Sequence, residues 1–92
     1  GTTTYRLKMK DILFLEKDGN YITYTTTSDK ILARQTVNEA LIHLSDSFIQ
    51  VHKSFIVNLD KINSFSKESI RINDINIPVG ESFRAGFLRI VS

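Results

Sequence analysis

Three polar residues that could do chemistry interrupt an apolar stretch. His52, Lys53 and Ser54 separate the apolar residues 48–51 from the apolar residues 55–57. A histidine near a serine could serve a hydrolase, but side chains two positions apart do not form a nucleophile–base pair by themselves, and no third orienting group is apparent. Taken alone, the stretch is explained most simply by a polar turn with a hydrogen-bonded histidine. The alternative is a binding loop held rigidly between two buried anchors.

The sequence contains no other catalytic or metal-binding pattern. It has two histidines and no cysteine, so disulfides and thiolate chemistry are excluded. His43 has no histidine, cysteine or carboxylate at metal-ligand spacing, and there is no glycine-rich phosphate loop. We therefore expect neither an enzyme nor a metal or cofactor site.

Length and composition indicate one globular domain over residues 1–92. Hydrophobic residues make up 41% of the chain and charged residues 24%, which are ordinary values for such a domain. The net charge of +2 permits an anionic partner without requiring one. No apolar run approaches the ~20 residues of a membrane span, so we expect no membrane association.

The elements that must position these residues are short. Alternation around Tyr5, Leu7 and Met9 predicts a strand within residues 2–10, unless residues 1–10 are the remnant of a linker. Asp18-Gly19 predicts a hairpin with a type I′ turn. Thr36 and Glu39 predict a capping box, followed by a short helix to about residue 44. Further strands are predicted at residues 12–15, 20–27, 30–35, 62–66, 70–72 and 75–77.

A second helix is predicted at the C-terminus. Phe83, Phe87 and Ile90 fall at helical spacing, and Glu81 would lie in the first turn of this helix. Many short strands with two small helices predict a mostly-β sandwich or barrel.

The segment Val51-His-Lys-Ser-Phe-Ile-Val-Asn58 resembles the central motif of the LytTR-type DNA-binding domain, the output domain of LytR/AlgR-family response regulators. The resemblance extends from about Ile12 to Leu88, because further motifs follow in the same order. These are Phe14-Leu-Glu16, Gly19-Asn-Tyr21, the set Arg34, Thr36 and Leu41, and Ile77-Pro-Val79.

The resemblance implies a mostly-β fold of small stacked antiparallel sheets, with one short capped helix and a C-terminal helix. It implies sequence-specific binding of double-stranded DNA through loops inserted in major grooves, in the control of bacterial transcription by a two-component system. It also implies a cytoplasmic protein, tandem direct repeats in the DNA, an N-terminal receiver domain before this chain, and no cofactor.

The site residues follow from the resemblance and from side-chain chemistry. Lys53 is the candidate for insertion into a groove, where it would bind guanine or neutralise a phosphate. Asn20 could pair with adenine or simply favour a turn. Arg34 is the candidate phosphate contact, and His52 is expected to bond to neighbouring backbone. The DNA-binding set is Asn20, Arg34, Lys53, Ser54 and Arg84, and the residues that support the loop are His52 and Asn58.

One position departs from the family pattern. Gly80-Glu81 occupies the place where the family often has Ser-Arg, and a carboxylate repels phosphates. Glu81 could accept a hydrogen bond from cytosine N4 or cap the helix, and Arg84 is the candidate for the missing cation.

The alternative function is a small β interaction domain that binds protein or peptide through a sheet edge. DNA binding requires one surface to carry Asn20, Arg34, Lys53 and Arg84. If these four residues lie on opposite faces, that alternative is favoured. A hydrolase would require the side chains of His52 and Ser54 in contact within a cleft.

Overall fold

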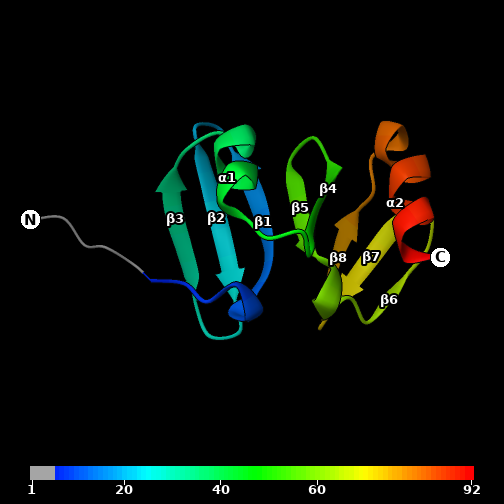
Figure 1. The fold of residues 1–92 in the computed structure, drawn as a ribbon, viewed down its shortest axis with the longest axis horizontal. Coiled ribbons are helices and arrows are strands. Elements are labelled where there is room, and N and C mark those ends of the chain that lie inside the picture. The colour runs from blue at the N-terminus through cyan, green and yellow to red at the C-terminus, as the bar shows by residue number, and fades with distance from the viewer. Residues whose placement is uncertain (1–5) are drawn as a thin grey trace, which may run out of the picture.

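Two antiparallel sheets lie side by side in the computed structural model, which describes residues 6–92 (Figure 1). The five-stranded sheet has the order β3-β2-β1-β5-β4, and the three-stranded sheet has the order β6-β7-β8. The strands of the first sheet are β1 (Ile12–Asp18), β2 (Tyr21–Thr26), β3 (Lys30–Arg34), β4 (Phe48–His52) and β5 (Phe55–Asn58). Those of the second are β6 (Ser64–Phe65), β7 (Ser69–Ile72) and β8 (Ile75–Pro78).

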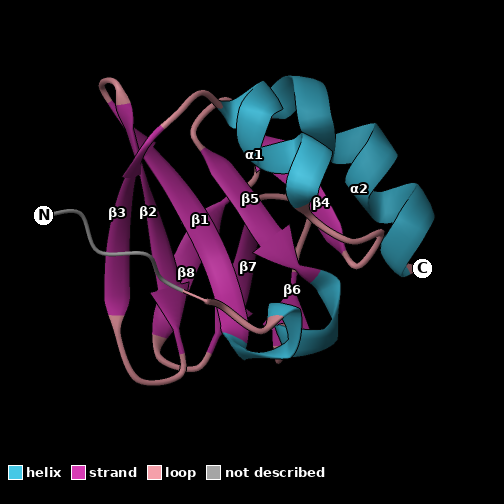
Figure 2. Cartoon of the chain, turned by 60° about the vertical axis from the view of Figure 1, so that its left-hand side comes forward, coloured by secondary structure: helices cyan, strands magenta, loops and turns pink. Residues whose placement is uncertain are grey.

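Two α-helices and three short 3-10 helices complete the chain. The α-helices are α1 (Val37–His43) and α2 (Arg84–Val91), and the 3-10 helices are η1 (Met9–Asp11), η2 (Leu59–Lys61) and η3 (Glu81–Phe83). Figure 2 shows α1 and α2 on the same side of the molecule. The predicted fold class, with stacked antiparallel sheets and two helices, is confirmed. Within residues 6–92, no helix is long and apolar enough to span a membrane.

The five-stranded sheet is covered on both faces, which explains why β1 opens with four apolar residues. Ile12 and Leu15 belong to a core beneath α1, together with Ala40. Leu13 and Phe14 belong to a second core, shared with the three-stranded sheet and α2. A strand buried on both faces reads as a continuous apolar run, so β1 is the central strand that its sequence predicts.

The hairpin between β1 and β2 turns one residue later than the sequence predicts. Asp18 pairs with Tyr21, so Gly19 and Asn20 are the two central residues. Gly19 has φ +60°, whereas Asn20 is not among the positive-φ residues. Positive φ at the first central residue alone is the pattern of a type II′ turn, which places glycine there. The type I′ turn at Asp18-Gly19 was therefore a wrong prediction.

Local signals position α1. The Thr36 hydroxyl accepts from the amide of Glu39 at 3.1 Å, and the Glu39 carboxylate accepts from the amide of Thr36 at 2.9 Å. These bonds satisfy two amides that a helix start leaves unpaired. The predicted capping box is therefore confirmed.

The strand predicted within residues 2–10 is not observed in the described part. Residues 6–8 have no regular structure and residues 9–11 form η1, while residues 2–5 lie outside the described part. Leu7 nevertheless packs against the core beneath α1. The amide of Asp11 donates to the carbonyl of Lys8, and the carbonyl of Asp11 accepts from the amide of Thr27. Residues 6–11 therefore fold over the end of the sheet instead of joining it as a strand.

Candidate nucleic-acid interface

The strand register brings the predicted binding loops to one end of the five-stranded sheet. Arg34 at the end of β3 pairs with Tyr21 at the start of β2, directly after the Gly19-Asn20 turn. On the other side of β1, the amide of Lys17 donates to the carbonyl of Ser54 at 2.7 Å. The β1–β2 and β4–β5 turns therefore lie at the same edge, which is the upper edge of Figure 1.

The segment that leads into α2 joins the same edge. The amide of Gly80 donates to the carbonyl of Val51 at 2.8 Å. A Cβ atom on Gly80 would lie only 3.5 Å from the Cα of His52, so the start of η3 packs against the end of β4. We call this surface the loop edge; it contains Glu81 together with the predicted contact residues Asn20, Arg34, Lys53, Ser54 and Arg84.

The two-residue turn between β4 and β5 presents Lys53 to solvent. The Nδ1 of His52 accepts from the amide of Ser54 at 3.0 Å, and the Nε2 of Gln50 donates to the carbonyl of His52 at 3.2 Å. The His52 ring also meets Phe55 edge to face, with 5.5 Å between centroids. Lys53 itself is exposed. The turn is therefore tied on both sides while its ammonium group is free to reach a ligand.

This geometry does not provide a nucleophile for hydrolysis. His52 bonds to the backbone of Ser54 and not to its hydroxyl. A histidine that accepts at Nδ1 from a backbone amide holds a turn, and it does not remove a proton from the serine. The contact that a His52–Ser54 hydrolase requires is not the one observed.

A hollow of about 330 Å³ brings Asn20 and Arg34 together, and Lys17, Thr36 and Glu39 also line it. The Arg34 guanidinium carbon lies 6.0 Å from the centroid of the Tyr21 ring, within the range of a cation–π contact. Asn20, Arg34 and Lys17 are all exposed. The amide of Asn20 and the cation of Arg34 therefore face solvent beside one another, with a second cation, Lys17, close by.

Lys17 and Tyr21 belong to this surface, although sequence reasoning did not select them as contact residues. A lysine two residues before the turn glycine was a usable signal for Lys17. The Tyr21–Arg34 contact depends on the pairing of β2 with β3, and no local sequence motif predicts it.

Arg84 differs from the other cations of the loop edge. It is half-buried at the start of α2, and its Nε is enclosed without a hydrogen-bond partner among residues 6–92. Its side chain is therefore less available to a ligand than the exposed Arg34 and Lys53.

Asn58 lies at the opposite end of β5 from the Lys53-Ser54 turn. It is 2% exposed, and its Nδ2 donates to the carbonyl of Ile12 at 2.9 Å and to that of Met9 at 3.4 Å. Its Oδ1 accepts from the amide of Asp60 at 3.0 Å. None of these bonds reaches the Lys53-Ser54 turn, which Asn58 is expected to support. The residue fixes η1 and the start of β1, because a buried amide needs partners for all its polar atoms.

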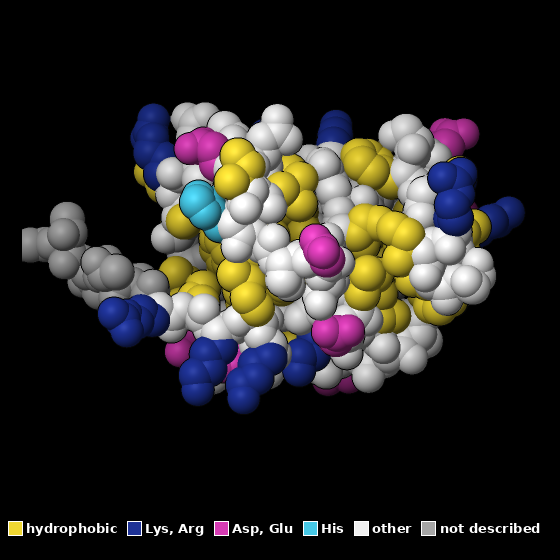
Figure 3. Space-filling view, in the orientation of Figure 1, with side chains coloured by type: hydrophobic (Ala, Val, Ile, Leu, Met, Phe, Trp, Pro, Cys, Tyr) yellow, Lys and Arg dark blue, Asp and Glu magenta, His cyan; other side chains and the backbone are white. Residues whose placement is uncertain are grey.

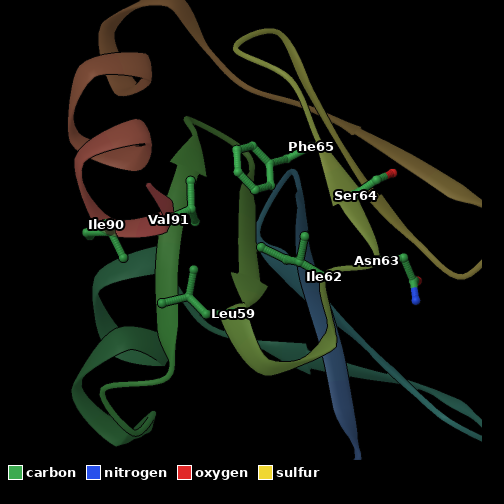
Figure 4. Close-up of a pocket in the computed structure, with 7 residues that line it drawn as sticks. All are labelled: Leu59, Ile62, Asn63, Ser64, Phe65, Ile90 and Val91. Atoms are coloured by element: carbon green, nitrogen blue, oxygen red, sulfur yellow. The ribbon is translucent and has the colours of Figure 1, made fainter.

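Charged and apolar surfaces also lie away from the loop edge. Figure 3 shows further Lys and Arg side chains along the lower edge, interspersed with acidic ones. A hollow of about 400 Å³ between η2, β6 and the end of α2 has no charged lining residue (Figure 4). Its lining is Leu59, Ile62, Asn63, Ser64, Phe65, Ile90 and Val91. Among residues 6–92, no group of three His, Cys, Asp or Glu side chains could hold a metal ion.

Comparison with known proteins identifies the domain type. The family described as the LytTr DNA-binding domain matches residues 2–92. The transcriptional regulatory protein NatR of Bacillus subtilis (strain 168) is 38% identical over 61 residues, which are 65% of this chain and 26% of that protein. The chain thus spans about a quarter of the length of this relative.

A solved structure shows the same fold. It is the LytTr DNA-binding domain of a Bacillus cereus protein described as a methyl-accepting/DNA response regulator. The TM-score is 0.81 at 19% identity, over 94% of this chain and 85% of that one. Since the family match covers nearly the whole sequence, the chain belongs to the LytTr DNA-binding domain family.

Proposed function

We propose that this domain binds double-stranded DNA sequence-specifically through the loop edge and controls transcription as the output domain of a bacterial two-component response regulator. The observation that carries the proposal is the strand register, which brings Asn20, Arg34 and Lys53 to one edge. Had Asn20, Arg34 and Lys53 lain on opposite faces, the interaction domain that binds through a sheet edge would have been favoured.

The residues of the loop edge divide into two kinds of contact. Phosphate contacts position a protein on DNA, whereas contacts with base edges give specificity. Lys53 is exposed on a turn that His52 ties down, so it is suited to entering a major groove. Ser54 follows it in the same turn. Asn20 is the candidate for adenine, whose N6 and N7 match an amide, and Arg34 is the phosphate contact.

We assign Arg84 to the same DNA-binding surface, where it contributes less to affinity than Arg34 and Lys53. Its start-of-helix position places it beside η3, but its half-buried side chain restricts it to a single peripheral phosphate. His52 acts indirectly, through the shape of the Lys53-Ser54 turn.

The proposal extends to the whole protein. NatR is named a transcriptional regulatory protein, and the solved relative comes from a response regulator. We infer a receiver domain N-terminal to this domain, a cytoplasmic location, and target sites arranged as tandem direct repeats that hold two copies side by side.

Selection of bound sequences from random duplex DNA tests the proposal. Repeated enrichment of one motif, at direct-repeat spacing, is the expected result. Binding should also weaken steeply with salt, because each neutralised phosphate adds ~0.9 to the slope of log affinity against log salt. Lys10→Ala is the control for loss of a cation outside the loop edge, because Lys10 is exposed but lies beside Asn58 at the other end of the sheet. This variant should keep the salt slope and the enriched motif of the wild type. A flat salt profile or the absence of an enriched motif would contradict the proposal.

A further inference from the structure

The loop edge contains an exposed carboxylate, Glu81, close to the exposed cation Lys53. Glu81 follows Gly80, which lies against His52, and Lys53 follows His52. With consecutive Cα atoms ~3.8 Å apart, the Cα atoms of Glu81 and Lys53 lie within roughly 13 Å of each other. That span covers about four base pairs at ~3.4 Å each, so both side chains can face the same stretch of DNA.

Glu81 lies in the first turn of η3, where the helix dipole favours a negative charge, but within residues 6–92 no cap hydrogen bond requires its carboxylate. It is exposed at the first position of η3, and η3 begins without a side-chain cap hydrogen bond. Helix α2 likewise begins without one. Capping, the simplest explanation for Glu81, therefore finds no support in the residues that the structure describes.

The chemistry of DNA restricts what a carboxylate at this edge can contact. Phosphates repel it, and it can only accept hydrogen bonds. In the major groove, cytosine presents the N4 amino group as its only polar atom, whereas adenine places the N7 acceptor next to its N6 amino group. Guanine presents two acceptors and thymine one acceptor and a methyl group. Cytosine is therefore the base whose edge best complements Glu81.

We propose that Glu81 is a specificity-determining residue that accepts a hydrogen bond from N4 of a cytosine within a few base pairs of the contact made by Lys53. This inference rests on the proposed function, because it requires the loop edge to face a major groove. It assigns to the edge a contact that selects a base and at the same time lowers affinity for all other sequences.

Parallel selections from random duplexes test the inference with the wild type, Glu81→Gln and Glu81→Ala. The wild type should enrich cytosine at one position. Glu81→Gln should shift that position to adenine, because an amide matches N6 and N7, and Glu81→Ala should leave it unselected. In titrations, replacing the cytosine should weaken wild-type binding roughly 5- to 150-fold and Glu81→Ala binding not at all.

Asp60→Asn controls for the loss of one negative charge, since Asp60 is exposed at the other end of the sheet, next to Asn58. It should leave the enriched motif unchanged. If the Glu81 variants enrich the wild-type motif and only gain affinity uniformly, the inference is overturned while the proposed function stands. If the wild type enriches no motif, both are overturned.

Discussion

The Nδ1 of His52 accepts a hydrogen bond from the backbone amide of Ser54 at 3.0 Å. This bond spans the turn that presents Lys53, so the shape of the proposed DNA-contacting turn depends on an imidazole that itself faces the protein. A neutral imidazole that accepts at Nδ1 carries its proton on Nε2.

We expect His52→Ala to lower stability and DNA affinity together. The variant leaves the Ser54 amide without its acceptor, which costs ~1–3 kcal/mol when the group is buried; Ser54 is half-buried, so the lower end of that range applies. His52→Gln should recover part of both, because its side-chain oxygen can accept the same bond. Thermal unfolding and DNA titration of the three proteins measure the effect. An unchanged melting temperature combined with lost sequence discrimination would place His52 among the base-contacting residues instead.

Arg34→Ala and Lys53→Ala should weaken DNA binding in different ways. Loss of a phosphate contact weakens binding to all duplexes alike and lowers the log–log salt slope by ~1, which we expect for Arg34→Ala. Lys53→Ala should cost ~1–3 kcal/mol on the selected site and less on random DNA. Titrations on both duplexes over a range of salt concentrations distinguish the two, with Lys10→Ala as the control. Equal losses for Lys53→Ala on both duplexes would reassign this residue to the backbone.

Features determined by neighbouring residues could be predicted from the sequence. The capping box needs only Thr36 and Glu39, three positions apart, and the polar break at residues 52–54 marks the β4–β5 turn. The β1–β2 turn was misplaced by one residue because Asp18-Gly19 and Gly19-Asn20 are both good turn pairs. The observed register pairs Lys17 with Ile22, and an Asp18-Gly19 turn would pair Leu15 with Ile22. Both registers keep Ile22 on the face that carries Leu15 in the core beneath α1, so the apolar pattern did not distinguish the two turns.

Contacts between distant segments could not be predicted in this way. The Asn58 amide bonds to Ile12, 46 positions earlier, and nothing near Asn58 in the sequence indicates that partner. The resemblance of residues 51–58 to the family motif was the guide to Asn58, and it does not indicate which end of the sheet the Asn58 side chain holds.

Asn58→Ala should therefore destabilise the fold without changing which DNA sequence is bound. The substitution leaves the Ile12 carbonyl and the Asp60 amide without their side-chain partner. An unpaired buried group costs ~1–3 kcal/mol, which applies to buried Ile12, whereas Asp60 is exposed and adds less. Asn58→Asp is the matched variant: it keeps the acceptor for Asp60 but loses the donor to Ile12, so it should also be destabilising. Denaturant unfolding gives the free energies, and selection at a temperature where all variants are folded gives the motifs. An altered motif with wild-type stability would instead mean that Asn58 supports the DNA-binding loop.

The Tyr21–Arg34 contact leads to a last prediction, about how the phosphate contact is oriented. The guanidinium of Arg34 lies 6.0 Å from the Tyr21 ring centroid, and a contact of this kind at an exposed site contributes ~0.5–1 kcal/mol. Tyr21→Ala should thus weaken binding to every duplex by roughly 2- to 5-fold, while Tyr21→Phe, which keeps the ring, should bind like the wild type. The decisive measurement is the DNA affinity of the double variant, which carries both Tyr21→Ala and Arg34→Ala. If Tyr21 acts only by orienting Arg34, Tyr21→Ala has no further effect in an Arg34→Ala background. An equal loss in both backgrounds would mean that the exposed Tyr21 ring touches the DNA itself, independently of Arg34.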